Sequence, residues 1–339
     1  MIVPALLLAA ALAQPPAALK DPFGPLYPID AEASYPAAIF QWLDSLAQTS
    51  VGKTIPAHRA DYVRRFGRAT PEDAAAIERF WKARLAHEQA TGSRSDLLGI
   101  FCAAPTMEAG MRTAGERLSA ERRADLEAAL AHFQPKFDQI WSGGSIPRRF
   151  LGAMRDDPST AKLSDLLGRA ARFFGADGAA LSPKPRLVLV PVPDGWGTHA
   201  QAIGRQLLLE IRPGDRLADQ AAVIVHENVH FLVEAMPEER RRGLERIAVA
   251  HAPHGAEAWA VLREALPTAL GQGVADRAFR PREWSRRLPW YDTPEVDAYA
   301  KAIYPLVQQA IELGSYFDAE FVRLAVELYP LRPPSRRSP

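Results

Sequence analysis

The chain has 339 residues, 41 basic and 40 acidic side chains with a formal net charge of +1, and a single cysteine. This charge balance argues against a nucleic acid or an anionic membrane surface as a partner, because either would select an excess of Lys and Arg. One cysteine excludes a disulfide within the chain. The fold must therefore be stabilised by a packed core, for which a chain of this length is ample.

The first 13 residues, MIVPALLLAAALA, form an uncharged apolar run. Its end, Ala11-Leu12-Ala13, fits the small-x-small pattern of a signal-peptidase site, although no basic residue precedes the run. The run is shorter than the roughly 20 residues that a membrane span requires. We therefore expect residues 1–13 to be a signal peptide. The mature protein is expected to be exported, to the periplasm or the medium, without stable insertion in a membrane.

Residues 14–36 are rich in Pro and Ala and predict an extended leader, and residues 37–180 predict a helical N-terminal region. Thr70-Pro71 marks one helix start in this region, because Thr is a good N-cap and Pro suits the first helical position. Ser119 marks the start of another helix. Residues 163–174 have the apolar spacing of a third.

The pattern changes after residue 180. The segments Arg186–Pro193 and Gly204–Ile211 are short, apolar and bounded by Pro or Gly, which predicts two strands. We expect residues 181–330 to form the second region, and residues 331–339 to be a disordered tail because they lack apolar periodicity. The fold class predicted for the whole chain is α+β, mostly α-helical with a small β-sheet.

The segment His226-Glu227-Asn228-Val229-His230 lies inside an apolar helical run. Residues i and i+4 of a helix share one face, so both imidazoles can reach one metal ion. Glu227 follows the first His by about 100° of rotation, which places its carboxylate beside that ion. This H-E-x-x-H pattern is the zinc-peptidase signature. It predicts that His226 and His230 bind Zn²⁺ and that Glu227 is the general base that takes a proton from water.

A catalytic zinc ion usually has three protein ligands and one open position. A third His six residues after His230 is excluded, because Met236 stands there. A Glu from the next helix is the alternative, and Glu257 fits because it follows a Gly-led turn and begins a helical pattern. His251 and His254 are rivals, but they lie in a loop with Pro and Gly whose orientation is loose.

The two motifs together resemble those of a known family. The segment Glu257-Ala258-Trp259-Ala260-Val261-Leu262-Arg263-Glu264 is similar to the E-G-W-A-x-x-x-E helix of glutamate-type zinc peptidases, the gluzincins, with Ala258 in place of Gly. The resemblance spans residues 186–270 and implies a zincin-like catalytic core beside the small sheet. It implies that Glu257 is the third zinc ligand. Glu264, two turns further on, is then expected behind the ligands or beside the substrate.

A peptidase of this kind also needs a donor directed at the oxyanion that develops on the substrate carbonyl. In the resembling families a downstream Tyr or His often has this role. Tyr304 is the first choice here, and Tyr291 is the second. His254 is a further candidate catalytic side chain, as a donor from the loop that lines the cleft.

These residues predict a zinc metallopeptidase that hydrolyses a peptide or protein substrate. A strand edge beside the metal helix is expected to bind the extended substrate by main-chain pairing. Two alternatives remain open: an inactive zincin-like binding or structural protein, because a fold does not guarantee activity, and a zinc hydrolase of a non-peptide amide or ester. The intact Glu227 favours an enzyme, because a structural zinc site needs no general base.

Overall fold

The computed structural model describes residue 27 and residues 29–47, 55–93, 95–142, 145–176, 184–194 and 199–330. The predicted signal peptide of residues 1–13 and the predicted tail of residues 331–339 lie outside them. The described residues are mostly helical and contain one four-stranded sheet, so the α+β prediction is confirmed. None of the helices in these ranges is long and apolar enough to cross a membrane.

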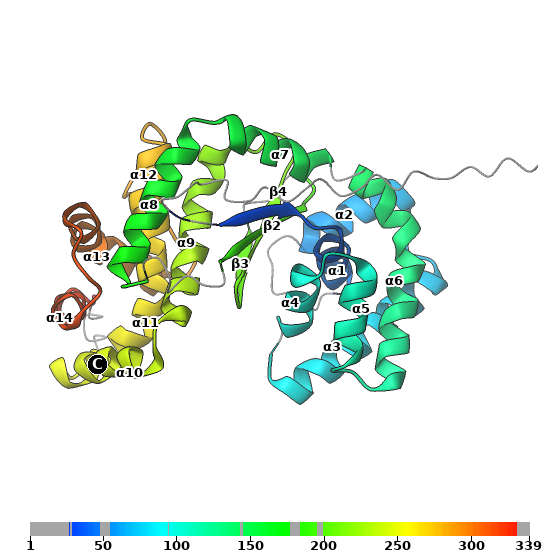
Figure 1. The fold of residues 1–339 in the computed structure, drawn as a ribbon, viewed down its shortest axis with the longest axis horizontal. Coiled ribbons are helices and arrows are strands. Elements are labelled where there is room, and N and C mark those ends of the chain that lie inside the picture. Colours follow the sequence, from blue (N-terminus) through cyan, green and yellow to red (C-terminus); the bar gives the residue numbers. More distant parts are fainter. Residues whose placement is uncertain are drawn as a thin grey trace, which may run out of the picture.

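The sheet lies at the centre of the molecule, between two groups of helices (Figure 1). Its strands are β1 (Asp30–Ala33), β2 (Arg186–Pro191), β3 (Ala200–Ile203) and β4 (Gln206–Ile211). They are arranged in the order β1-β2-β4-β3, so β1 and β3 form the edges. β2 is parallel to β1 and β4, and β3 is antiparallel to β4.

The two predicted strands correspond to β2 and β4, each slightly shorter than predicted. The edge strands β1 and β3 were not predicted, because each has only four residues and little apolar character. β1 lies in the segment expected to be an extended leader, and it pairs with β2 from Asp30↔Arg186 to Ala33↔Leu189. Part of that leader is therefore a component of the sheet.

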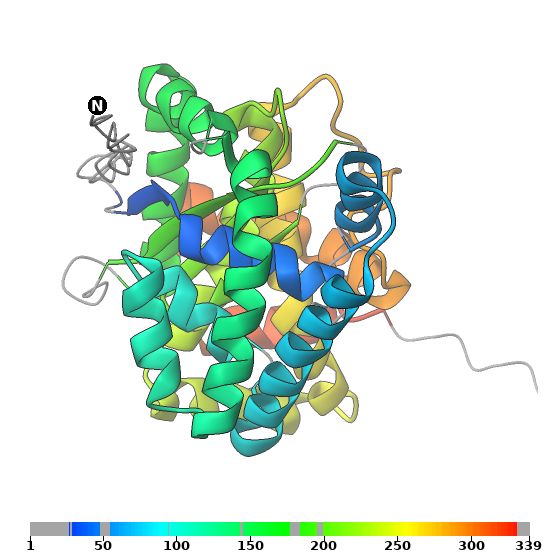
Figure 2. The ribbon, with the colours of Figure 1, turned by 90° about the vertical axis from the view of Figure 1, so that its right-hand side faces the viewer.

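Six helices form the group on one face of the sheet, in front in Figure 2. They are α1 (Tyr35–Leu46), α2 (Ile55–Phe66), α3 (Pro71–Thr91), α4 (Asp96–Ala103), α5 (Met107–Gly115) and α6 (Ala120–Trp141). The predicted helix starts are confirmed. The Thr70 side chain caps α3 in a capping box with Asp73, and the Ser119 side chain caps α6.

The remaining helices form the group on the other face (Figure 1). They are α7 (Ser145–Asp156), α8 (Ser159–Phe173), α9 (Leu217–Ala235), α10 (Glu238–His251), α11 (Gly255–Thr268), the π-helix η4 (Ala269–Ala275), α12 (Asp276–Phe279), α13 (Pro294–Leu313) and α14 (Ala319–Glu327). α8 confirms the third predicted helix. α7 and α8 share the core of the C-terminal helices rather than that of α1–α6.

The sheet separates two hydrophobic cores. On β2, Leu187 and Leu189 face the core under α8 and α9, whereas Val188 and Val190 face the core under α1. Burial on both faces explains why this strand is an unbroken apolar run rather than an alternating one. α9 packs against β3 and β4 and against η4, which places the H-E-x-x-H segment beside the edge strand.

The contact between α9 and η4 depends on Gly271. A Cβ atom there would lie 2.5 Å from the carbonyl oxygen of Ala222 and 3.0 Å from Cβ of His226. Backbone atoms cannot move aside cheaply, so η4 would have to shift away from α9. This close approach holds the two elements together at the turn that carries His226.

We predict that Gly271→Ala lowers the free energy of unfolding by about 1–3 kcal/mol, the usual cost of overpacking. Urea denaturation followed by circular dichroism measures this change. Gly243→Ala on α10 is the matched control, because a Cβ there meets nothing within 4 Å, and Ala is the better helix former by about 0.5–1 kcal/mol. Equal stability of the two variants would contradict the prediction.

Candidate metal centre

Three side chains from two helices meet beside the sheet: His226 and His230 on α9 and Glu264 on α11. Nε2 of His226 lies 3.0 Å from Oε1 of Glu264 and 3.2 Å from Nε2 of His230. Nε2 of His230 lies 3.5 Å from Oε2 of Glu264. Among the described residues, this is the group of His, Cys, Asp or Glu side chains whose ligand atoms are close enough to hold one metal ion.

These separations fit a tetrahedral zinc site. Zinc binds His nitrogen and carboxylate oxygen at about 2.0–2.2 Å, which puts neighbouring ligand atoms roughly 3.3–3.6 Å apart. The observed separations of 3.0, 3.2 and 3.5 Å are close to that range. The donor set of two imidazoles and one carboxylate is also one that catalytic zinc uses. The three side chains therefore need only small movements to bind an ion.

In this group the carboxylate of Glu264 lies between the imidazoles of His226 and His230. Burial alone would raise the pKa of Glu264, but hydrogen bonds from His226 and His230 hold it well below its usual range. Burial alone would lower the pKa of His230, but the hydrogen bond with Glu264 raises it. His226 is only 7% exposed. The carboxylate is thus stabilised as an anion, the form that binds a cation.

Glu257, the ligand expected from the resemblance, does not join this group. It is exposed, and it interacts with the Tyr329 hydroxyl. Seven residues separate it from Glu264, which is about 10.5 Å along the helix axis. α9 meets α11 at the later turn, so Glu264, not Glu257, is the carboxylate that lies with His226 and His230.

The two rival histidines also lie elsewhere. The His254 ring nitrogen lies 3.1 Å from the carbonyl oxygen of Val326, and its ring stacks on Tyr329. His251 pairs with Glu327. His254 precedes Glu264 by ten residues, or about 15 Å of helix. The expected catalytic role of His254 is therefore corrected: the side chain anchors the start of α11 to α14.

Glu227 is half-buried and lies between α9 and the edge strand. Its Oε2 atom accepts a hydrogen bond of 2.8 Å from the backbone N–H of Ala202 in β3. This N–H lies on the edge of β3 that faces away from β4. A peptide that paired with this edge would compete with Glu227 for the same donor. Pairing of an extended peptide with the free edge of β3 would therefore be restricted at Ala202.

Of the two candidate tyrosines, Tyr291 is the one that lies beside the group of His226, His230 and Glu264. Its ring stacks on His226 with centroids 6.2 Å apart and an interplanar angle of 4°. Burial, together with the charges of Glu264 and Glu227 and a hydrogen bond to Glu264, raises the pKa of Tyr291 to about 12. The hydroxyl therefore keeps its proton at neutral pH. It is a hydrogen-bond donor beside the carboxylates of Glu264 and Glu227.

Tyr304, the first choice from the sequence, lies outside the group. Its hydroxyl accepts a hydrogen bond of 2.8 Å from Arg277, and its ring packs against Trp284 and Trp290. Gly273 allows this packing, because a Cβ there would lie 2.6 Å from the Tyr304 ring. Of the two tyrosines named as oxyanion candidates, the structure therefore brings Tyr291, not Tyr304, to His226. Tyr291 stands in the irregular segment before α13, where no helical or strand periodicity predicts the direction of a side chain.

A hydrogen bond from Tyr27 and the stacking of Tyr291 on His226 hold α9, the helix that carries the H-E-x-x-H segment, in place. The Tyr27 hydroxyl donates a hydrogen bond of 2.5 Å to Oδ1 of Asn228, which is fully buried. Nδ1 of His226 has no hydrogen-bond partner among the described residues, so stacking on Tyr291 and contact with Gly271 orient this ring. Most zinc-binding histidines are oriented instead by a second hydrogen bond.

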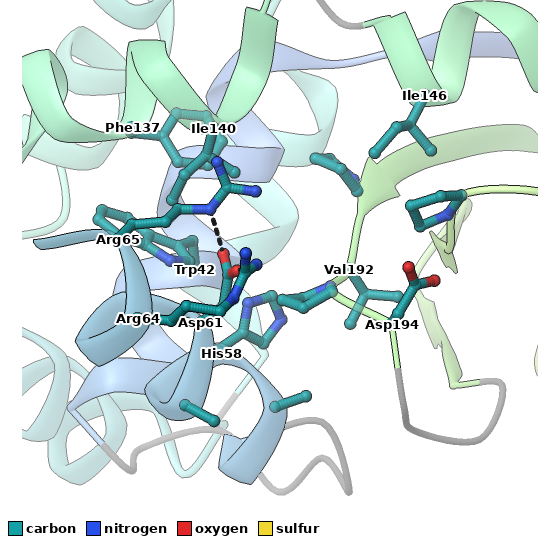
Figure 3. Close-up of a pocket in the computed structure, with 15 residues that line it drawn as sticks. Trp42, His58, Asp61, Arg64, Arg65, Phe137, Ile140, Ile146, Val192 and Asp194 are labelled. Atoms are coloured by element: carbon teal, nitrogen blue, oxygen red, sulfur yellow. Dashed lines mark hydrogen bonds and ion pairs between the residues drawn. The ribbon is translucent and has the colours of Figure 1, made fainter.

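A separate cavity of about 390 Å³ lies between α2, α6 and the residues that follow β2 (Figure 3). Trp42 and Phe137 on its walls belong to the core under α1. Its polar side chains include His58, 2% exposed with a pKa lowered by burial, and Asp61, which is paired with Arg64 and Arg65. None of the three metal-ligand side chains lines this cavity, so it is distinct from the candidate metal centre.

Comparisons with protein-family models, with curated proteins and with solved structures find no match to this chain. The resemblance to gluzincins therefore depends on the motif residues alone. The functional argument depends on the geometry around His226, His230 and Glu264.

We predict that Glu264→Gln weakens zinc binding by more than about 100-fold, because even groups behind the ligands of a zinc site contribute 10–100-fold. His226→Ala should do the same. Glu257→Gln is the matched control on the same helix and should bind zinc as the unmodified protein does. Zinc content after dialysis and titration with a competing chelator measure the affinities. Loss of zinc in Glu257→Gln with retention in Glu264→Gln would restore the original assignment.

Proposed function

We propose that this chain is a zinc-dependent metallopeptidase. The observation that carries the proposal is the spacing of His226, His230 and Glu264, which matches a three-ligand zinc site with an open fourth position. A zinc ion held there supplies a Lewis acid that lowers the pKa of a water molecule to about 7 and polarises a substrate carbonyl. The chain supplies the remaining groups.

Glu227 is the proposed general base. It is adjacent to His226 in the sequence and is half-buried at the open side of α9. The hydrogen bond from Ala202 fixes one oxygen of its carboxylate. A carboxylate so oriented takes a proton from the attacking water and returns it to the leaving amine.

Tyr291 is the proposed oxyanion donor. Its hydroxyl is protonated at neutral pH, because its pKa is raised to about 12, and it lies against Glu264. A donor already in place near the metal ligands stabilises the developing negative charge with little reorganisation. The stacking on His226 keeps the ring in that position.

The site bears on one of the two alternatives. A structural zinc site is normally closed by four protein ligands, whereas three converge here among the described side chains, with a carboxylate beside them. This favours an enzyme over an inactive zincin-like binding or structural protein. Hydrolysis of a non-peptide amide or an ester would use the same groups. We propose export, to the periplasm or the medium, on the basis of the apolar residues 1–13.

We predict that zinc-loaded protein cleaves members of a fluorogenic peptide library and that a chelator abolishes this cleavage. Glu227→Gln should lower kcat by about 10²–10⁴-fold, the usual contribution of a general base, while the zinc content stays unchanged. Retention of activity in Glu227→Gln would refute the general-base assignment. Full zinc occupancy without turnover of any peptide would favour the alternatives.

The two tyrosines give a second prediction. Tyr291→Phe removes only the hydroxyl, and we expect kcat to fall by about 10²–10³-fold, as for loss of one oxyanion donor. Tyr304→Phe is the matched control, because its hydroxyl bonds to Arg277 away from the metal ligands, and its kcat should be unchanged. Steady-state kinetics at saturating peptide measure both. The reverse result would return the role to Tyr304.

A further inference from the structure

A cavity of about 370 Å³ lies between α9, α10 and α11, on the side of the candidate metal centre towards the end of α9. This volume is within the range of small-molecule sites. Its wall residues include Val233 and Glu234 of α9 and Ala260 and Arg263 of α11. The helices that bind the metal ion thus also line this cavity.

The cavity begins one helical turn from the proposed zinc ligands. Glu234 follows His230 by four residues, and Ala260 precedes Glu264 by four residues. Each step is about 6 Å along its helix. The charge of Glu234 acts on the pKa of His230, which supports this closeness. The cavity wall is therefore about one helical turn from the proposed zinc ligands, a distance that the side chain of a substrate residue next to the scissile bond can span.

One exposed face of α9 extends from the candidate metal centre to the cavity. Glu227, His230 and Glu234 are partly or fully exposed on successive turns, and the neighbours of Glu227 and His230 on the helix are buried. Residues at i, i+3 and i+7 share one face. The general base, a metal ligand and the rim of the cavity thus follow one line along the helix.

Most of the residues that line the cavity are apolar, and the others are charged. Trp259 stacks on Phe317 with centroids 6.4 Å apart and an interplanar angle of 15°. Phe317 is itself fixed, since its N–H donates to the carbonyl oxygen of Phe173 and its carbonyl accepts from Arg240. The other apolar residues of the lining are Val233, Met236, Leu262, Leu266 and Pro267.

The charged residues of the lining balance one another. Glu234 and Glu245 carry two negative charges, and Arg241 and Arg263 carry two positive charges. A balanced rim gives no net attraction for an acidic or a basic side chain. The apolar residues of the wall instead favour burial of an apolar group.

We propose that this cavity is the specificity pocket of the peptidase and that it binds a large apolar or aromatic side chain next to the scissile bond. This inference rests on the proposed function, because it takes the zinc site as the place of cleavage. Trp259 and Phe317 provide the aromatic wall. The substrate class is then a polypeptide cleaved beside Phe, Leu or a similar residue.

The test compares blocked peptides that differ at one residue on either side of the scissile bond, with Phe, Leu, Ala, Glu or Lys at that position. The unmodified protein should prefer Phe or Leu to Ala by at least about tenfold in kcat/KM, as expected for methylene groups in an apolar pocket. Ala260→Phe fills the cavity from an exposed position of α11 and leaves the core intact. It should remove this preference for Phe or Leu over Ala, through a higher KM for the Phe and Leu peptides.

Ala250→Phe is the matched control. Ala250 is exposed on α10 and does not line the cavity, so this variant should keep the preference. If the unmodified protein and Ala260→Phe cleave all five peptides with the same relative rates, the pocket assignment is wrong while the proposed function stands.

A binding measurement separates the two proposals. In Glu227→Gln, which is expected to hold zinc and to turn over far more slowly, calorimetric titration should show the Phe peptide binding at least about tenfold more tightly than the Ala peptide. Adding Ala260→Phe should abolish that difference. Equal binding of the two peptides to Glu227→Gln overturns the pocket. Absence of cleavage by the unmodified protein, with the binding difference intact, overturns the peptidase and keeps the pocket.

Discussion

The structure depends on one carboxylate between two imidazoles. Glu264 reaches across from α11 to His226 and His230 on α9, and without a cation these three groups are a costly set to bury. Their mutual hydrogen bonds reduce this cost and fix where α9 and α11 meet. The same contact sets the positions of Glu227, of Tyr291 and of the cavity that begins one turn away.

The sequence predicted the part of the site that is local. His226, Glu227 and His230 occupy one helix, so their relative positions follow from helix geometry alone. Glu257 and Glu264 are seven residues apart and share one face of α11, so periodicity cannot tell which of them meets α9. That choice is made by the crossing point of two helices, which is a tertiary feature. Gly255, where an added Cβ would collide with backbone of α10, and Gly271 of η4, where it would collide with backbone of α9, allow the close packing of the elements on either side of this crossing.

The fold was predictable to a similar extent. Thr70 and Ser119 marked helix starts correctly, because capping is a local interaction. The apolar runs of β2 and β4 also indicated strands. β1 was missed because Asp30–Ala33 has no strand pattern of its own and is held by its partner β2. Tyr27 was likewise assigned to a leader, although its hydroxyl supports Asn228 inside the metal-binding motif.

The pairing of β1 with β2 also bears on how the chain folds. Asp30 pairs with Arg186. Between them in the sequence lie α1–α6, which belong to one core, and α7 and α8, which belong to the other. Such a high contact order makes folding slow, because the entropy of closing a long loop is lost before the strand contacts form. During synthesis, β1 has no partner until β2 has emerged. The β1 edge of the sheet, opposite the β3 edge beside which α9 lies, is therefore completed late.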